Sequence, residues 1–230
     1  MRGLSKSVSA SGSLRVLAAL LSYPGKAMRS DLPEMREILR SEGALSVARQ
    51  VELETLIDTL AKSDPLESEA NYVQLFDSSR ATSLHLFEHV HGDSRDRGPA
   101  MIDLAQTYEK AGLYLEPGEL PDYLPAVLEF VSTQPQLEAR AFLGEITHIL
   151  NSLFSALQQR ASSYASVIAA LLELAGEQVQ VVKPAVELPL DEAWAEPPAF
   201  DGCSIKGQAK PGEAQPIHFV RKNVNTGAVT

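Results

Sequence analysis

The strongest constraint on the fold is the spacing of apolar residues, which follows the helical period along most of the chain. The period is lost after Gly176, a natural helix end, and six of the fourteen prolines lie beyond it. Hydrophobic residues make up 44% of the 230 residues but aromatic residues only 6%, which fits a helical chain rich in Ala and Leu. We therefore predict an all-α fold, a single helical bundle of about eight or nine helices over residues 13–176 with an extended C-terminal tail.

Start and stop signals divide this bundle into helices. Ser13 is placed to cap a first helix, Asp31 and Pro33 open a second that stops before Gly43, and Asp64 and Pro65 open a fourth. A single long helix is expected over residues 137–158, and a last one over residues 162–175. The third helix, over residues 44–62, is expected to bury one apolar stripe: Val47, Val51, Leu53, Leu56, Ile57 and Leu60.

Outside the bundle, we expect residues 1–12 to be disordered and residues 177–230 to form a Pro-rich tail. A short piece of the tail around Trp194 should dock on the body, because a tryptophan is costly to leave in water. The N-terminal apolar run, residues 16–21, is too short to cross a bilayer, and the turn at residues 23–25 follows it without a small-residue cleavage site. We therefore expect no signal peptide and no direct membrane insertion.

Charge and cysteine content narrow the function further. The formal net charge is −10, although residues 1–29 carry five basic side chains and no acid. An acidic body argues against nucleic-acid binding and suits basic partners, including peptides that carry arginines. The lone Cys203 excludes an internal disulfide framework and a self-contained cysteine-ligated metal site, which makes a cytoplasmic location the expectation.

The densest group of chemically active residues lies in the stretch 83–98. On a helix, His85, Glu88 and His89 would share one face, and His91 and Asp93 follow closely. These are metal-ligand types, so a helical metal-dependent hydrolase is the alternative hypothesis. No distant glutamate stands out as a third ligand, however, and the simpler interpretation is that these histidines bond neighbouring loops and pin the following turn. We therefore predict no catalytic and no metal site.

Three arginines accompany this stretch: Arg80, Arg95 and Arg97. They either order a salt-bridged loop or offer guanidinium groups to a phosphate or carboxylate. The sequence leaves both interpretations open. No glycine-rich phosphate-binding loop and no nucleophile elbow is present.

The block from Tyr72 to Gly98 resembles the signature of the delta-subunit family of respiratory nitrate reductase, a branch of the redox-enzyme maturation chaperones. Residues 119–130 resemble a second block, in which Leu120 and Tyr123 stand where the wider group has Glu and His. Leu20 to Pro24 match the family opening, and Trp194 to Pro197 resemble its C-terminal motif. The likeness spans about residues 14–200.

This resemblance implies an all-helical cytoplasmic chaperone without enzymatic activity. Its partner would be the catalytic alpha subunit of nitrate reductase, bound chiefly at the N-terminal segment. The subunit would be held competent for molybdenum-cofactor and iron–sulfur insertion before it docks at the membrane. No cofactor would be bound stably, but Arg80, Arg95 and Arg97 are candidates for a transient contact with molybdopterin guanine dinucleotide. A monomer is expected.

The candidate client-binding residues lie in the two matching blocks. For the aromatic members the competing interpretation is a place in the core, and for the two aspartates it is ordering of helix ends. The candidates are Tyr72, Phe76, Asp77, His85, Phe87, Glu88, His89, Asp122 and Tyr123.

Overall fold

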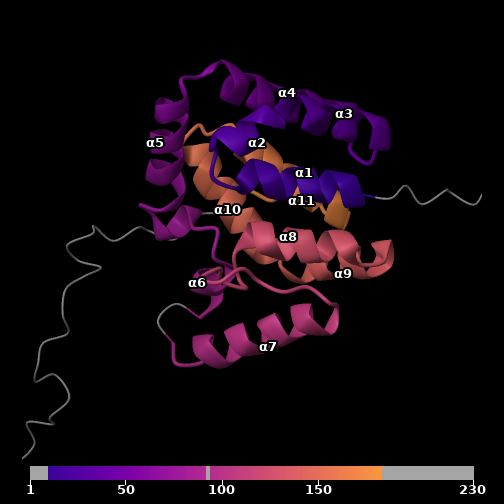
Figure 1. Ribbon diagram of the computed structural model, residues 1–230, viewed down its shortest axis with the longest axis vertical. Coiled ribbons are helices and arrows are strands. Elements are labelled where there is room, and N and C mark those ends of the chain that lie inside the picture. Colours follow the sequence, from indigo (N-terminus) through magenta and orange to yellow (C-terminus); the bar gives the residue numbers. More distant parts are fainter. Residues whose placement is uncertain (1–9, 92–93, 183–230) are drawn as a thin grey trace, which may run out of the picture. The chain divides into compact units, whose positions relative to one another are not determined.

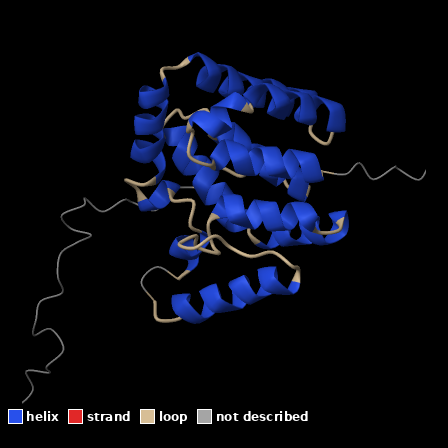
Figure 2. Ribbon diagram, viewed as in Figure 1, coloured by secondary structure: helices blue, strands red, loops and turns tan. Residues whose placement is uncertain are grey.

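The computed structural model describes residues 10–91 and 94–182, and the regular structure of this part is entirely helical (Figures 1 and 2). This confirms the all-α prediction. The helices are α1 (Ser11–Leu21), α2 (Lys26–Ser30), α3 (Leu32–Glu42), α4 (Val47–Lys62), α5 (Pro65–Phe76), the 3₁₀ turn η1 (Arg80–Thr82), α6 (Leu86–Val90), α7 (Arg97–Lys110), α8 (Leu124–Thr133), α9 (Gln136–Glu145), α10 (Thr147–Gln159) and α11 (Ala165–Ala175).

Two helices lie at the centre of the core. Nine of the eleven residues of α11 are buried, and this helix packs against α10, α9, α4 and α1. Helix α1 lies chiefly against α8 and also contacts α3 and α11. A helix that is apolar on every side must be covered on every side. Helices α3, α4, α8, α9 and α10 therefore pack around α11 and α1 (Figure 1).

Both ends of α1 are satisfied by groups from other helices. At its N-terminus, the backbone N–H groups of Gly12 and Ser13 donate to the carboxylate of Glu42, at 2.9 and 2.6 Å. The expectation that Ser13 caps this helix is therefore wrong, because Glu42 at the end of α3 supplies a charged acceptor there. At the other end, the Tyr72 hydroxyl donates to the carbonyl oxygen of Leu21 at 2.7 Å. The position of α1 is thereby tied to α3 and α5.

The described residues form eleven α-helices rather than eight or nine. One addition is α2, whose five residues are too few to show a period. The other arises because the single long helix expected over 137–158 is interrupted at Ile146, two residues after Gly144, into α9 and α10. A glycine weakens helix continuity because it has more conformational freedom than other residues.

The stripe predicted for α4 is correct in part. Leu53, Leu56, Ile57 and Leu60 are buried, but Val47 and Val51 are 78% and 57% exposed. Val51 precedes Leu53 by two residues, and two residues turn a helix by about 200°, so these side chains point to opposite sides. The two valines therefore belong to the solvent face.

Helix α7 lies at the edge of the bundle and contacts the other helices sparsely (Figure 1). Tyr108 is its one buried residue; its hydroxyl donates to the carbonyl oxygen of Pro121 at 2.8 Å and its ring lies 4.9 Å from that of Phe130. At its N-terminus, Arg97 contacts Glu88 and Asp122. Helix α7 is thus anchored at its two ends.

No helix in the described part of the chain has the length and apolar character needed to span a bilayer. The predicted disordered start, residues 1–12, lies mostly outside the described residues, and α1 begins at Ser11. The predicted docking around Trp194 lies wholly outside them. The segment that follows α11 is described as far as Val182.

Two helix-ending glycines provide a matched pair for a stability test. Gly43 and Gly176 both adopt left-handed backbone, with φ of 61° and 81°. A β-carbon at Gly43 would meet no atom, whereas at Gly176 it would meet the guanidinium of Arg140, which donates to the carbonyl of Ala175. We expect Gly43→Ala to lower the free energy of unfolding by about 1 kcal/mol and Gly176→Ala by about 2–3 kcal/mol. Urea denaturation checks this order, and equal losses would contradict it.

Candidate functional site

The residues predicted from the two sequence blocks come together at one place. A short antiparallel bridge pairs His85 with Tyr123 and thereby joins the segment before α6 to the start of α8. Leu86 N–H donates to the carbonyl oxygen of Asp122 at 3.0 Å, and Leu124 N–H donates to that of Leu84 at 2.8 Å. Two blocks about 37 residues apart in sequence therefore form one unit.

Asp122 is the buried centre of this unit, with no exposed surface. Its carboxylate accepts a hydrogen bond from the N–H of Phe87 at 3.1 Å, which satisfies a donor at the start of α6. His85 Nδ1 lies 3.2 Å from the same carboxylate, and the guanidinium of Arg97 lies 3.8 Å from it. A buried carboxylate needs such partners, because desolvation of an isolated charge is costly. Asp122 therefore orders the start of α6.

The hydrogen bond to Asp122 raises the pKa of His85 above its ordinary value of 6.5. Partial burial of the imidazole acts in the opposite direction, and the charges of Asp122 and Glu88 add to the increase while Arg97 reduces it. His85 is therefore held as a charged partner of Asp122 over a wider pH range than a histidine in water.

A chain of aromatic side chains connects this unit to the core. The hydroxyls of Tyr72 and Tyr123 lie 3.1 Å apart, and the ring of Tyr123 lies 5.4 Å from that of His85. Tyr72 also packs against Phe76, and Phe76 packs against Tyr164. Burial raises the pKa of Tyr72 strongly, so its hydroxyl is a permanent donor. Tyr72 and Phe76, each 4% exposed, lie in the core.

The histidine and arginine side chains are used in local contacts. His89 Nε2 donates to the carbonyl oxygen of Ser83 at 2.8 Å, which pins the turn before α6. Arg80 donates to the carbonyl oxygen of Glu88 at 3.0 Å, and Arg97 lies 3.5 Å from the Glu88 carboxylate. Arg95 is exposed. Of the three arginines, Arg80 and Arg97 therefore hold the loop, and Arg95 faces solvent.

The metal-site pattern depends on a helix through His85, and the structure lacks one there. Helix α6 begins at Leu86, and His85 has extended backbone with φ −88° and ψ 107°. His85 turns to Asp122 while His89 turns to Ser83, so they do not share a face. Within residues 10–91 and 94–182, no three His, Cys, Asp or Glu side chains are grouped to hold a metal ion. Asp93 lies outside these residues.

Sequence reasoning missed an acidic and apolar surface beside this unit. Glu69 and Val73 of α5, and Asp77 directly after it, follow one another at a spacing of four residues and lie beside the buried stripe of this helix. Tyr23 donates to Glu69 at 3.0 Å. Burial raises the pKa of Tyr123, and the nearby carboxylates of Asp77 and Glu119 raise it further, although the hydrogen bond with Tyr72 acts against both effects. We define the α5 face by six residues, of which Glu69 is half-buried and the others are exposed: Tyr23, Glu69, Val73, Asp77, Glu119 and Leu120.

The fold places the chain in a class of helical proteins with a known architecture. A solved structure of a putative redox enzyme maturation protein from Archaeoglobus fulgidus covers 77% of this chain and 100% of its own, with a TM-score of 0.55 and 21% identity. This likeness shows a shared helical architecture. The chain belongs to the nitrate reductase delta subunit family, whose profile matches residues 28–170.

Several curated relatives are named as assembly chaperones. The Escherichia coli K12 protein named nitrate reductase molybdenum cofactor assembly chaperone NarJ is 41% identical over 94% of this chain and 89% of its own length. The probable chaperone NarW of the same strain is 37% identical over 72% and 69%. A probable NarJ of Bacillus subtilis is 31% identical over 68% and 84%. The predicted family is confirmed, and so is the prediction that the chain is not an enzyme, because these similar relatives are assembly chaperones.

Replacing Asp122 tests whether it organises the site. Asp122→Ala leaves the Phe87 N–H without its acceptor and removes the counter-ion of His85 and Arg97. We expect a loss of about 3 kcal/mol in the free energy of unfolding, measured by urea denaturation. The control is Asp77→Ala on the exposed side of α5, for which we expect a change within about 0.5 kcal/mol. Equal losses in the free energy of unfolding would show that Asp122 contributes no more to stability than the exposed Asp77.

The raised pKa of His85 predicts a pH-dependent contribution to stability. The folded state binds this proton more tightly than the unfolded state, so the stabilisation is complete below the ordinary pKa of 6.5 and is lost as the pH rises through the folded-state pKa. His85→Gln should therefore cost more stability, relative to wild type, at about pH 5.5 than at about pH 8.5. Urea denaturation at both pH values measures this difference. His148→Gln, at an exposed position on α10, is the control and should leave the wild-type pH profile unchanged.

Proposed function

We propose that this chain is a cytoplasmic assembly chaperone that binds the catalytic subunit of a nitrate reductase, chiefly at that subunit's N-terminal segment. It holds the client competent for insertion of the molybdenum cofactor and iron–sulfur clusters before the complex docks at the membrane. The observation that carries this proposal is the 41% identity to an Escherichia coli nitrate reductase molybdenum cofactor assembly chaperone over 94% of the chain.

The α5 face is the surface that fits such a client segment. This face combines three carboxylates, Glu69, Asp77 and Glu119, with partly exposed apolar side chains, of which Tyr23 is 48% and Leu120 44% exposed. An amphipathic helix with basic residues beside its apolar stripe is complementary to this pattern. The client segment would place its apolar side against Tyr23, Val73 and Leu120 and its basic side chains against the carboxylates.

The predicted client-binding residues then take two different roles. Asp77 is exposed on this face, and the half-buried Tyr123 lies beneath it. Tyr72, Phe76 and Asp122 support the face from inside the fold. His85, Phe87, Glu88 and His89 lie at the adjoining turn and α6, where they can meet a longer client segment. Client binding would therefore be most sensitive to substitution of the exposed residues of the α5 face.

The contact with molybdopterin guanine dinucleotide is part of this proposal and concerns mainly Arg95. Arg80 and Arg97 are bonded to Glu88, whereas Arg95 is exposed and can reach a phosphate. No stable cofactor is proposed. The chaperone is taken to act as a monomer.

Two pairs of charge reversals test the α5 face. We expect Glu69→Lys with Asp77→Lys to weaken binding to the client's N-terminal segment by about tenfold or more, because both substitutions replace attraction by repulsion. Glu109→Lys with Glu177→Lys changes the net charge equally at exposed positions elsewhere and should leave the affinity close to wild type. Titration calorimetry with the full-length chaperone measures both.

The partner itself is tested by affinity capture of the tagged protein from its own cells grown anaerobically on nitrate. The proposed function requires recovery of a molybdenum-enzyme catalytic subunit, lost when that subunit's N-terminal segment is deleted. If the subunit is captured but both pairs of reversals bind equally well, the chaperone assignment stands and the α5 face is the wrong surface.

A further inference from the structure

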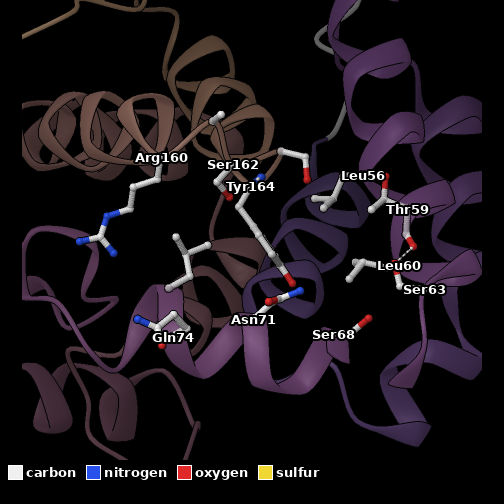
Figure 3. A pocket seen from close by; sticks show the side chains of 13 residues that line it. Leu56, Thr59, Leu60, Ser63, Ser68, Asn71, Gln74, Arg160, Ser162 and Tyr164 are labelled. Atoms are coloured by element: carbon white, nitrogen blue, oxygen red, sulfur yellow. Dashed lines mark hydrogen bonds between the residues drawn. The ribbon is translucent and has the colours of Figure 1, made fainter. Parts of the chain in front are cut away.

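A cleft of about 530 Å³ opens on another side of α5, between α4, α5 and the loop from α10 to α11 (Figure 3). Leucine side chains form its apolar wall: Leu56, Leu60 and Leu75. Neutral polar groups, including those of Asn71 and Gln74, line the rest. Among the described residues that line the cleft, Arg160 carries the single charge. This lining suits an extended polypeptide segment with an apolar and an acidic side chain.

The hydroxyl of Tyr164 points into this cleft (Figure 3). Tyr164 is 8% exposed, and within the described part of the chain its hydroxyl has no hydrogen-bond partner. A buried hydroxyl without a partner is energetically unfavourable. Burial also raises the pKa of Tyr164, so the group remains a donor. The cleft therefore contains an oriented donor that a backbone carbonyl would satisfy.

The chain after α11 already runs toward this cleft. Gln180 N–H donates to Asn151 Oδ1 at 2.7 Å, and Val182 N–H donates to Ser155 Oγ at 3.0 Å. Two extended residues advance about 6.6 Å and four helical residues about 6 Å, so the segment and α10 are in register. Residue 180 is bonded to residue 151, and residue 182 is bonded to residue 155. The segment therefore runs toward the C-terminal end of α10.

These two hydrogen bonds are donated by every second backbone N–H of the segment. The next residue in this series is Pro184, which has no N–H group, so the series ends at Val182. From Ser155 to Arg160 the helix rises about 7.5 Å, a distance that two or three extended residues cover. Residues 185–187 can therefore reach the cleft. They include Val186, which suits the leucine wall, and Glu187, which is complementary to Arg160.

We propose that residues 183–187 bind in this cleft as an extended strand. Val186 packs on the leucine wall, Glu187 lies beside Arg160, and a backbone carbonyl accepts the Tyr164 hydroxyl. The tether at Val182 keeps the segment at an effective concentration in roughly the millimolar range, so weak contacts are sufficient. The occupant of the cleft is thus a segment of the same chain. This proposal does not depend on the proposed function.

Cross-linking in the full-length chain tests the proposal. The background is Cys203→Ser, which removes the single cysteine. In Gln74→Cys with Val186→Cys, a short bismaleimide should join the two thiols within one chain. We expect this at a rate about tenfold higher than in the control pair Ile102→Cys with Val186→Cys, whose first thiol is on exposed α7. Equal rates for the two pairs would overturn the proposal.

Charge exchange separates specific binding from simple proximity. Arg160→Glu should slow the cross-link between residues 74 and 186, and Glu187→Arg added to it should restore the rate. A rate indifferent to both changes would show that the pairing does not exist. A cross-link that joins two chains would overturn the proposal. It would show that the cleft is occupied by a second copy of the chain. Circular dichroism confirms that all variants retain the helical fold.

Discussion

One buried carboxylate determines how the two signature segments and α7 meet. Asp122 is removed from water, so its charge must be balanced within the fold. It receives a backbone N–H from the start of α6, an imidazole from the turn before α6 and a guanidinium from the start of α7. Removing the carboxylate would leave all three of these groups without their shared partner. The positions of α6, α7 and α8 are therefore coupled through this side chain.

Helix α5 serves two purposes through two separate sets of side chains. Tyr72 and Phe76 fix it to the core, and the Tyr72 hydroxyl also satisfies the last turn of α1. Its outward side presents Glu69, Val73 and Asp77. Because the two sets of residues do not overlap, the outer side can vary in charge without loss of packing. This separation suits a protein that must bind a partner without changing its own core.

The sequence predicts helices well where apolar spacing is long and where Gly or Pro marks an end, as at Gly43 and Gly176. It fails for α2, which is too short to show a period, and for Val51, whose angular position excludes it from the stripe of α4. In the site, the two signature blocks meet at His85, Asp122 and Tyr123, and their role in client binding stays a prediction. The sequence cannot show that His85 lies outside α6, which removes the metal pattern, because the bridge to Tyr123 and the bond to Asp122 depend on tertiary contacts.

The sparse attachment of α7 has a consequence for the hierarchy of local stability. A helix held by Arg97 at one end and Tyr108 at the other, with little apolar burial between them, can open as a unit while the α1 and α11 core stays intact. Its amides would then exchange with solvent through a partly unfolded state well below the free energy of global unfolding. The molecule combines a rigid interior with one helix in a separate, less stable cooperative unit. That unit is joined directly to the carboxylate that orders the signature loop.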